Sequence, residues 1–167
     1  MSACVRSMLL LALISVAGCG PRVDLTQALH IEVVDTGWFD AGIVNGQNKL
    51  VPSLTFTLKN NSSQKLTSLQ VNALFRRVTE KDEWGSGFVT AAGSSGLAPG
   101  ATTPPITIRS QLGYTGSDQS RQEMLSNTHF VDAKVEVFAK YGSAQWTRIG
   151  EYPITRKLIE KPAKGAK

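Results

Sequence analysis

The chain has 167 residues, of which 41% are hydrophobic, 7% aromatic and 19% charged, and its formal net charge is +5. This length is typical of one domain. The apolar fraction excludes an intrinsically disordered chain, which lacks the apolar surface to offset its ordering entropy. The only dense apolar run, at residues 8–17, is shorter than the roughly 20 residues of a membrane-spanning helix.

Residues 1–18 have the layout of a secretory signal peptide. Arg6 supplies the positive charge, an apolar segment follows at residues 8–14, and small residues come next. The sequence Val16-Ala17-Gly18-Cys19 resembles the lipobox of bacterial lipoproteins. This resemblance implies that Cys19 receives a diacylglycerol, that the signal peptide is cut before it, and that the new amine is acylated. A conventional signal peptide followed by a chance cysteine is the alternative.

The cysteine content favours the lipoprotein interpretation. Cys4 lies inside the predicted signal peptide, so the mature chain has one thiol, at its first position, and can form no internal disulfide. Acyl chains on Cys19 would anchor the protein in a membrane, because each buried CH₂ contributes about 0.8 kcal/mol. Gly20 follows the cysteine, and the enterobacterial sorting rule of this family then implies the periplasmic face of the outer membrane rather than the inner membrane.

The positive charge is concentrated at the C-terminus. Residues 19–155 contain 12 basic and 12 acidic residues, whereas residues 156–167 contain five basic residues and one acid. We expect residues 157–167 to form a disordered basic tail, with contact to anionic lipid headgroups as the alternative. A neutral body lacks the basic stripe of a nucleic-acid-binding protein, so no nucleic-acid partner is expected.

Residues 29–156 are predicted to form an antiparallel β-sandwich, after a tether over residues 19–28. Apolar and polar residues alternate with a period of two, which is typical of strands with one buried face. The alternating segments lie at residues 29–34, 54–59, 69–76, 84–89, 106–109, 131–141 and 145–154. About seven strands fit an immunoglobulin-like sandwich, and a small barrel is the alternative.

Turn-forming residues separate these segments. Residues 60–64 are polar, and their number is one that hairpins tolerate. Gly142 predicts a tight two-residue hairpin after the strand at residues 131–141. Pro153 cannot donate a hydrogen bond within a sheet, so the last strand should lie at an edge or end at a bulge.

One short helix is expected within residues 116–127. Ser117 or Asp118 is suited to cap its N-terminus, and Asn127 is suited to end it. The predicted fold class is therefore all-β, with a single short helix added to the sandwich.

Residues 52–75 contain a predicted strand, an Asn-rich turn and a second strand, and Leu97-Ala98-Pro99-Gly100 precedes a further β segment. These two stretches resemble the opening and the Leu-x-Pro-Gly connection of bacterial FxLYD-type immunoglobulin-like modules. Arg76-Arg77-Val78 stands where the family has its Leu-Tyr-Asp triplet. The resemblance implies an extracytoplasmic adhesion or assembly module without catalysis, and it supplies no site residues.

The sequence contains no recognisable catalytic or metal-binding pattern. His30, His129 and one cysteine are too few for a zinc site. Residues 93–96 lack the spacing of a serine-hydrolase nucleophile elbow. The acids at residues 80–83 lack the interleaved oxygen ligands of a calcium loop. We therefore expect no enzymatic activity, no metal and no cofactor.

Four residues are candidates for contacts with a partner, namely Trp38, Phe39, Trp84 and Arg76. Packing in the core is the default expectation for the three aromatic residues, because aromatic side chains dominate core packing. If they were exposed, they would form a binding hot spot, since Trp and Arg dominate interface energetics. The period of the strand predicts that Arg76 points outward.

Three apolar residues on nominally outward positions, Val34, Leu74 and Phe138, could form an additional patch, unless the short helix covers them. The favoured function is a lipid-anchored, non-catalytic binding or assembly module of the cell envelope, with an envelope protein as its partner. The alternatives are an envelope small-ligand carrier or enzyme with an unrecognised site, which a concave pocket would favour, and a structural spacer.

Overall fold

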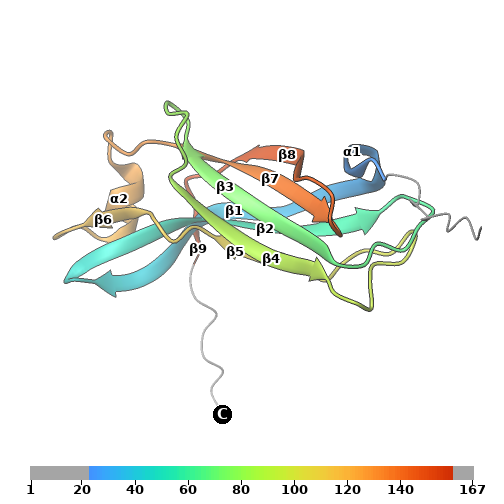
Figure 1. Ribbon diagram of the computed structural model, residues 1–167. Coiled ribbons are helices and arrows are strands. Elements are labelled where there is room, and N and C mark those ends of the chain that lie inside the picture. Colours follow the sequence, from blue (N-terminus) through green and yellow to red (C-terminus); the bar gives the residue numbers. More distant parts are fainter. Residues whose placement is uncertain (1–22, 160–167) are drawn as a thin grey trace, which may run out of the picture.

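The computed structural model describes residues 23–159, so the predicted signal peptide, Cys19 and residues 160–167 of the predicted tail lie outside the described residues. The described chain forms two β-sheets packed face to face, which confirms the predicted all-β sandwich (Figure 1). The elements are α1 (Leu25–Ala28), β1 (Leu29–Val44), β2 (Gln47–Asn60), β3 (Leu69–Arg77), β4 (Gly85–Ala92), β5 (Ile106–Arg109), β6 (Tyr114–Gly116), α2 (Arg121–Ser126), β7 (Ala133–Tyr141), β8 (Thr147–Pro153) and β9 (Leu158–Ile159).

The first sheet is built around a long hairpin of β1 and β2. Its strand order is β5-β2-β1-β9, with β6 also paired to β2, and β9 runs parallel to β1. Asn45 and Gly46 connect the hairpin with φ angles of 51° and 76°, as a type I′ turn requires. Register shifts after Val33 and Asp40 are β-bulges, which bend a strand and increase its twist.

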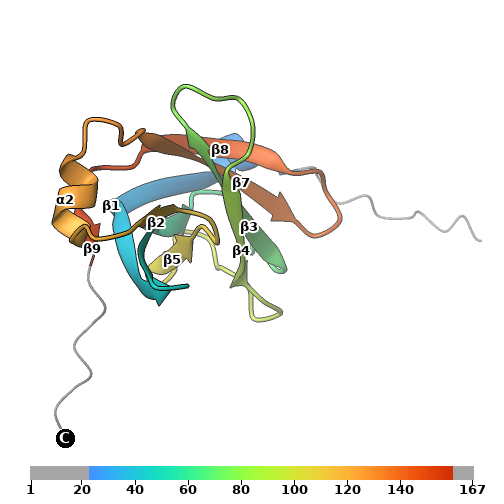
Figure 2. The same cartoon turned by 90° about the vertical axis from the view of Figure 1, so that its left-hand side faces the viewer.

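The second sheet has the strand order β4-β3-β7-β8, with every pair antiparallel. In β3 and β7 the odd-numbered residues are buried up to Phe75 and Ala139, and the even-numbered residues face outward. β8 is an edge strand that ends at Pro153, as predicted. Figure 2 shows β1, β2 and β5 in one layer and β3, β4, β7 and β8 in the other, with α2 beside them.

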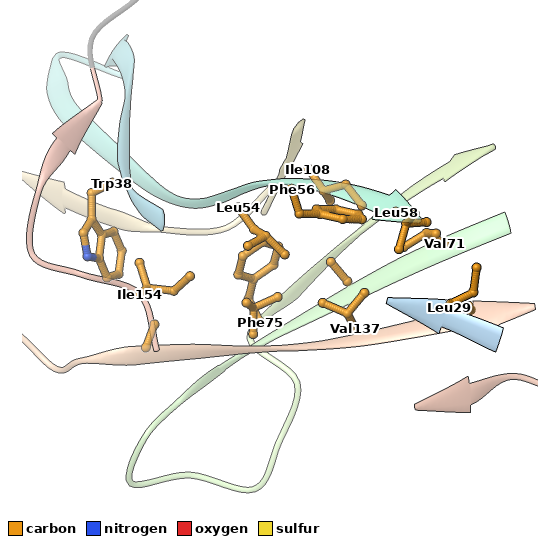
Figure 3. Close-up of a cluster of buried hydrophobic side chains, with 14 of the residues drawn as sticks. Leu29, Trp38, Leu54, Phe56, Leu58, Val71, Phe75, Ile108, Val137 and Ile154 are labelled. Atoms are coloured by element: carbon orange, nitrogen blue, oxygen red, sulfur yellow. The ribbon is translucent and has the colours of Figure 1, made fainter. Parts of the chain in front are cut away.

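The hydrophobic core lies between the two sheets. Leu54, Phe56 and Leu58 of β2 point toward Phe75 of β3 and Val137 of β7, and all five are fully buried (Figure 3). Each such side chain stabilises the fold by about 1.5–3 kcal/mol relative to an exposed position. The alternation read from the sequence predicts this core correctly, because a period of two places one set of residues between the sheets.

The connection at residues 60–64 is not the hairpin that the sequence predicted, because β2 and β3 belong to different sheets. Asn60 is fully buried at this crossing. Its amide donates hydrogen bonds to the carbonyl oxygens of Gln64 (2.7 Å) and Leu97 (2.9 Å), and its carbonyl oxygen accepts one from the Ser62 N–H (3.0 Å). A short polar loop suits both a hairpin and a crossing between sheets, so its length and composition did not distinguish them.

The first two strands are longer than the predicted segments at residues 29–34 and 54–59, and two predicted domain boundaries also differ from the structure. Residues 25–28 of the predicted tether form α1, and Leu25 and Ala28 are buried. In the predicted tail, Leu158–Ile159 forms β9, and the Trp38 N–H donates to the Lys157 carbonyl oxygen at 2.7 Å. A few buried apolar residues are enough to fold these short segments onto the sandwich, although their composition is that of a linker.

The predicted helix is present as α2 and ends at Asn127 as expected, but its N-cap is Ser120 rather than Ser117 or Asp118. Ser120 accepts a hydrogen bond from the backbone N–H of Glu123, and Glu123 accepts one from the backbone N–H of Ser120. This is a capping box, which satisfies two backbone donors at the start of a helix. The hydrogen bond from Ser120 lowers the pKa of Glu123.

The turn after β7 is present, but the predicted two-residue hairpin is wrong. Gly142 has a φ angle of 55°, and the Ala144 N–H donates to the Tyr141 carbonyl oxygen at 3.1 Å. The next strand begins only at Thr147, so the connection is longer than a tight hairpin. The glycine indicated the turn correctly, whereas the loop length depends on where pairing with β7 resumes.

Candidate functional site

The four candidate residues occupy three separate places in the structure. Trp38 and Trp84 meet in one aromatic cluster, Phe39 lies on the outer face of the first sheet, and Arg76 lies on the outer face of the second. They therefore do not form one site.

The aromatic cluster consists of Trp38, Trp84, Tyr114 and Phe130. The ring centroid of Trp38 lies 5.8 Å from that of Trp84, 5.5 Å from that of Tyr114 and 4.6 Å from that of Phe130. Trp38 is fully buried and Trp84 is half-buried. Trp38 thus packs in the core, and the cluster closes the end of the sandwich next to α2.

Polar contacts hold this end of the sandwich in place. The Tyr114 hydroxyl accepts a hydrogen bond from the Val131 N–H at 2.9 Å and lies 3.1 Å from the Val131 carbonyl oxygen. The Arg156 guanidinium lies 5.2 Å from the Phe130 ring centroid and donates to Asp132 at 2.7 Å. The hydrogen bond that Arg156 donates to Asp132 raises the pKa of Arg156, because it stabilises the charged guanidinium. The Tyr114 contacts attach the loop before β7 to β6, and the Arg156 contacts attach it to the segment after β8.

A cavity of about 240 Å³ lies beside the aromatic cluster. It is lined by Tyr114, Thr115, Gln119, Met124, Asn127, His129 and Phe130. Binding sites for drug-sized ligands usually measure about 300–1,000 Å³, so this cavity suits only a small ligand. Within residues 23–159, no group of three His, Cys, Asp or Glu side chains is placed to hold a metal ion.

Phe39 is nearly buried although it faces outward from the first sheet. Its side chain is 8% exposed, and the Arg109 guanidinium lies 3.6 Å from the ring centroid. Phe39 also pairs in register with Val51 of β2 and Ile159 of β9. A partner would have to displace Arg109 to reach this ring.

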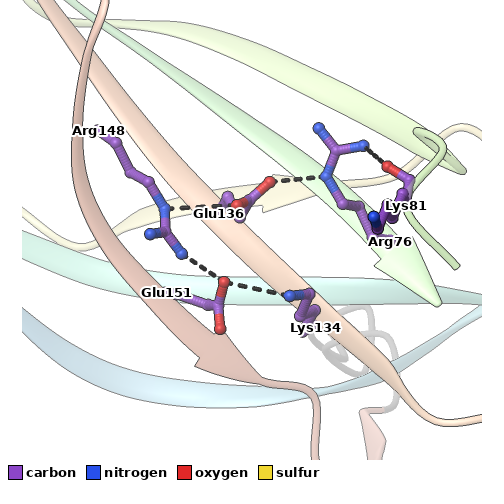
Figure 4. Close-up of polar contacts among 6 residues, drawn as sticks. All are labelled: Arg76, Lys81, Lys134, Glu136, Arg148 and Glu151. Atoms are coloured by element: carbon purple, nitrogen blue, oxygen red, sulfur yellow. Dashed lines mark hydrogen bonds and ion pairs between the residues drawn. The ribbon is translucent and has the colours of Figure 1, made fainter. Parts of the chain in front are cut away.

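Arg76 points outward, as predicted, and takes part in an ion-pair network across β3, β7 and β8 (Figure 4). Its Nε lies 2.6 Å from Glu136, and Arg148 Nε lies 3.4 Å from the same carboxylate. Glu151 contacts both Arg148 and Lys134. The hydrogen bond from Arg76 lowers the pKa of Glu136, because it stabilises the ionised carboxylate.

The outer face of the second sheet also presents exposed aromatic rings that sequence reasoning missed. Phe88 is 57% exposed and Trp146 is 39% exposed, and their rings stack edge to face with centroids 6.2 Å apart. Lys140 Nζ lies 5.9 Å from the Trp146 ring centroid. We call Phe88, Trp146, Lys140 and the half-buried Phe138 the outer-face patch. The signal that could have revealed the patch is Phe88, an aromatic residue at an outward position of β4.

The three-residue patch predicted at Val34, Leu74 and Phe138 is divided between the sheets. Leu74 and Phe138 belong to β3 and β7 of the second sheet, whereas Val34 lies in β1 of the first. An alternating pattern shows which residues share a face of one strand, but it does not show which strands share a sheet.

Comparisons with known proteins give no family assignment. No protein family and no curated protein matches the chain. A solved structure described as Northeast Structural Genomics Consortium target SoR45 has a TM-score of 0.45 and 14% identity, over 84% of this chain and 92% of that chain. The ligand binding region of serine-glutamate repeat protein A of Enterococcus faecium has a TM-score of 0.33 and 18% identity, over 74% and 88%. Within residues 23–159, no helix is long and hydrophobic enough to cross a bilayer.

Proposed function

We propose that this protein is a lipid-anchored lipoprotein of the bacterial cell envelope, at the periplasmic face of the outer membrane, whose β-sandwich binds an envelope protein without catalysing a reaction. The observation that carries the proposal is the short distance between the lipobox and the fold. α1 begins at Leu25, six residues after Cys19. Six residues span at most about 20 Å, so acyl chains on Cys19 would hold the sandwich directly at the membrane surface.

The end of the sandwich that carries α1 would lie nearest to the membrane. Val23 lies beside residues 61–64 and residues 143–145, with which it lines two shallow hollows. α2 and the Asn45-Gly46 turn lie at the opposite end of the molecule (Figure 1). The cavity beside the aromatic cluster would therefore be remote from the lipid surface.

The outer-face patch is the surface best suited to bind a protein partner. It combines two exposed aromatic rings with Lys140, beside the ion-pair network of Arg76. Trp and Arg side chains contribute most of the binding energy in protein interfaces, especially where apolar neighbours exclude water. The network contains three cations and two acids, and Lys140 is a further cation on the same face. This excess of positive charge favours an acidic partner surface.

Metabolic labelling tests the anchor. Wild-type chain, Cys19→Ser and Cys4→Ser are produced in a bacterium supplied with an alkyne-tagged palmitate, and the membranes are then separated. Wild type and Cys4→Ser should carry the label and appear in the outer-membrane fraction, while Cys19→Ser should carry none. An unlabelled wild-type chain, or a labelled Cys19→Ser chain, contradicts the proposal.

In-cell cross-linking followed by affinity purification tests the binding surface. Trp146→Ala should lose a cross-linked protein that wild type retains, because it removes the largest exposed ring of the patch. Thr107→Ala, at an exposed position of the opposite sheet, is the matched control and should retain that protein. Equal recovery with all three chains would assign binding to another surface.

A further inference from the structure

β4 is an edge strand with one unpaired side. It pairs with β3 and stands at the end of the order β4-β3-β7-β8. Hydrogen-bonded and non-hydrogen-bonded pairs alternate along antiparallel strands. The Val78 N–H donates to the Asp132 carbonyl oxygen and the Gly142 N–H to the Ser68 carbonyl oxygen, so the even-numbered residues of β3 bond to β7. The odd-numbered residues of β3 consequently bond to β4.

This alternation identifies the backbone groups on the open side of β4. The odd-numbered residues of β3 stand opposite Gly85, Gly87 and Val89. The N–H and C=O groups of Ser86, Phe88 and Thr90 therefore point away from β3. Within the described residues, no backbone hydrogen bond from another element reaches these three residues on that side. Unpaired groups of this kind are a template for pairing with another strand.

β4 has fewer protective features than the other sheet edges in the described part of the chain, where its one irregularity is a bulge at Ala91. Folded proteins guard their edges with charged side chains, proline, bulges or short strands. The short edge strands are β5 with four residues, β6 with three and β9 with two. The part of β1 that β9 does not cover carries Glu32, Asp35 and a register shift after Val33, and β8 carries Arg148, Glu151 and Pro153. The eight residues of β4 include no charge and no proline.

We propose that the open side of β4 pairs with the same side of a second copy of this chain, in an antiparallel register that places Phe88 opposite Phe88 and Ser86 opposite Thr90. The strand is self-complementary in this register. It joins two aromatic rings and two hydroxyl pairs, which are favourable cross-strand pairs, and it opposes no like charges. The contact is two-fold symmetric and closes as a dimer with one continuous sheet of eight strands.

Exposure of Phe88 supports this register. Phe88 is 57% exposed and Trp146 is 39% exposed, and these are the two aromatic residues among the exposed large hydrophobic residues of the described surface. The Trp146 ring covers Phe88 from one side. The second Phe88 would cover it from the open side. The dimer axis is perpendicular to the sheet, so the two α1 ends point in opposite directions.

The chain beginning at Gly20 tests the dimer independently of the proposed function, because it carries no acyl chain. Residues 23–159 contain both sheets and the core between them, and a β-sheet circular-dichroism spectrum of this chain is the first control. Sedimentation equilibrium should show a concentration-dependent dimer for wild type and Thr90→Ala. Thr90→Pro removes an outward N–H and no bond to β3, so it should keep the circular-dichroism spectrum of wild type and weaken the dimer at least about tenfold.

Disulfide cross-linking tests the register. The chain from Gly20 contains no cysteine, so a single one can be introduced. Phe88→Cys places two thiols opposite each other at the axis, whereas the two thiols of Ser86→Cys would be separated by about 14 Å along the strands. Phe88→Cys should cross-link at least about tenfold faster. A wild type that stays monomeric at every concentration up to about 1 mM, an unweakened Thr90→Pro dimer, or equal cross-linking of the two cysteine variants overturns the proposal.

Discussion

At the scale of single residues, the sandwich depends on a few buried polar side chains as well as on its apolar core. Asn60 accepts and donates hydrogen bonds that join the end of β2 to residues 62–64 and to Leu97. A leucine at this position would remove these three hydrogen bonds and leave the Ser62 N–H without its acceptor, although the Leu97 and Gln64 carbonyl oxygens would each keep a second donor. Each lost hydrogen bond costs about 0.5–1.5 kcal/mol.

Asn60→Leu should therefore lower the free energy of unfolding by about 2–4 kcal/mol. Asn61→Ala changes an exposed side chain next to it and should stay within about 0.5 kcal/mol of wild type. Urea denaturation of the two variants measures both values. Equal stabilities would contradict the structural role of Asn60.

The sequence predicted the placement of some of these side chains and not of others. The default expectation of core packing holds for Trp38, and the period of two predicted that Arg76 points outward. Trp84 approaches Trp38 because the start of β4 lies against β1 of the other sheet. A local sequence pattern carries no information on how two sheets are placed. Phe88 and Trp146 were missed because an exposed aromatic pair forms only after β7 and β8 bring Trp146 over the sheet.

At the scale of elements, β9 is held by a close approach that requires glycine. A Cβ atom added to Gly37 would lie 2.7 Å from the Lys157 carbonyl oxygen and 2.9 Å from Ile159 Cγ1. Gly37→Ala should displace β9, destabilise the protein by about 1–3 kcal/mol and increase hydrogen exchange of the Trp38 amide, which donates to Lys157.

Gly93→Ala is the matched control, because its added Cβ would meet no heavy atom within 4 Å. Its exchange rates and stability should match those of wild type. Protection of the Trp38 amide that survives Gly37→Ala would show that β9 does not depend on this glycine.

The ion-pair network of β3, β7 and β8 should make stability depend on pH. The pKa of Glu136 is lowered in the folded protein, chiefly by the hydrogen bond from Arg76. Its contribution is therefore fully present above the unfolded pKa, near 4.5, and is lost as the pH falls through the lower folded value. Glu136→Gln should cost about 1 kcal/mol at pH 7 and almost nothing at about pH 3.

A double-mutant cycle with Arg76→Gln isolates this pair. The coupling free energy between Arg76 and Glu136, measured by denaturation at each pH, should decrease on acidification. A coupling that is constant from about pH 7 to about pH 3 would contradict the assignment of Arg76 as the main cause of the lowered pKa.

The elements themselves were predicted where the signal is local. Alternation located β3, β5 and β7 closely, because one buried face imposes a period of two. The Asn45-Gly46 turn of the long hairpin carried a strong type I′ signal that was overlooked. β9 and the β2–β3 crossing were not predictable, since both depend on contacts between distant segments of the chain.

At the scale of the whole molecule, a predicted lipid anchor is joined to a sandwich whose charges balance. The sequence from residue 19 to residue 155 carries balanced charges, so the body is not drawn to an anionic membrane by itself. Acyl chains on Cys19 would provide the membrane affinity, and α1 begins close enough to Cys19 to keep the sandwich at the surface. The protein's partners would then meet it in the plane of the membrane.

Intact-mass and peptide mass spectrometry of the mature protein, purified from bacterial membranes, tests this account most directly. The first residue should be Cys19, carrying a diacylglycerol thioether and an acylated amine, with residues 1–18 absent. A mature chain that starts at another residue, or one that starts at an unmodified Cys19, would contradict it.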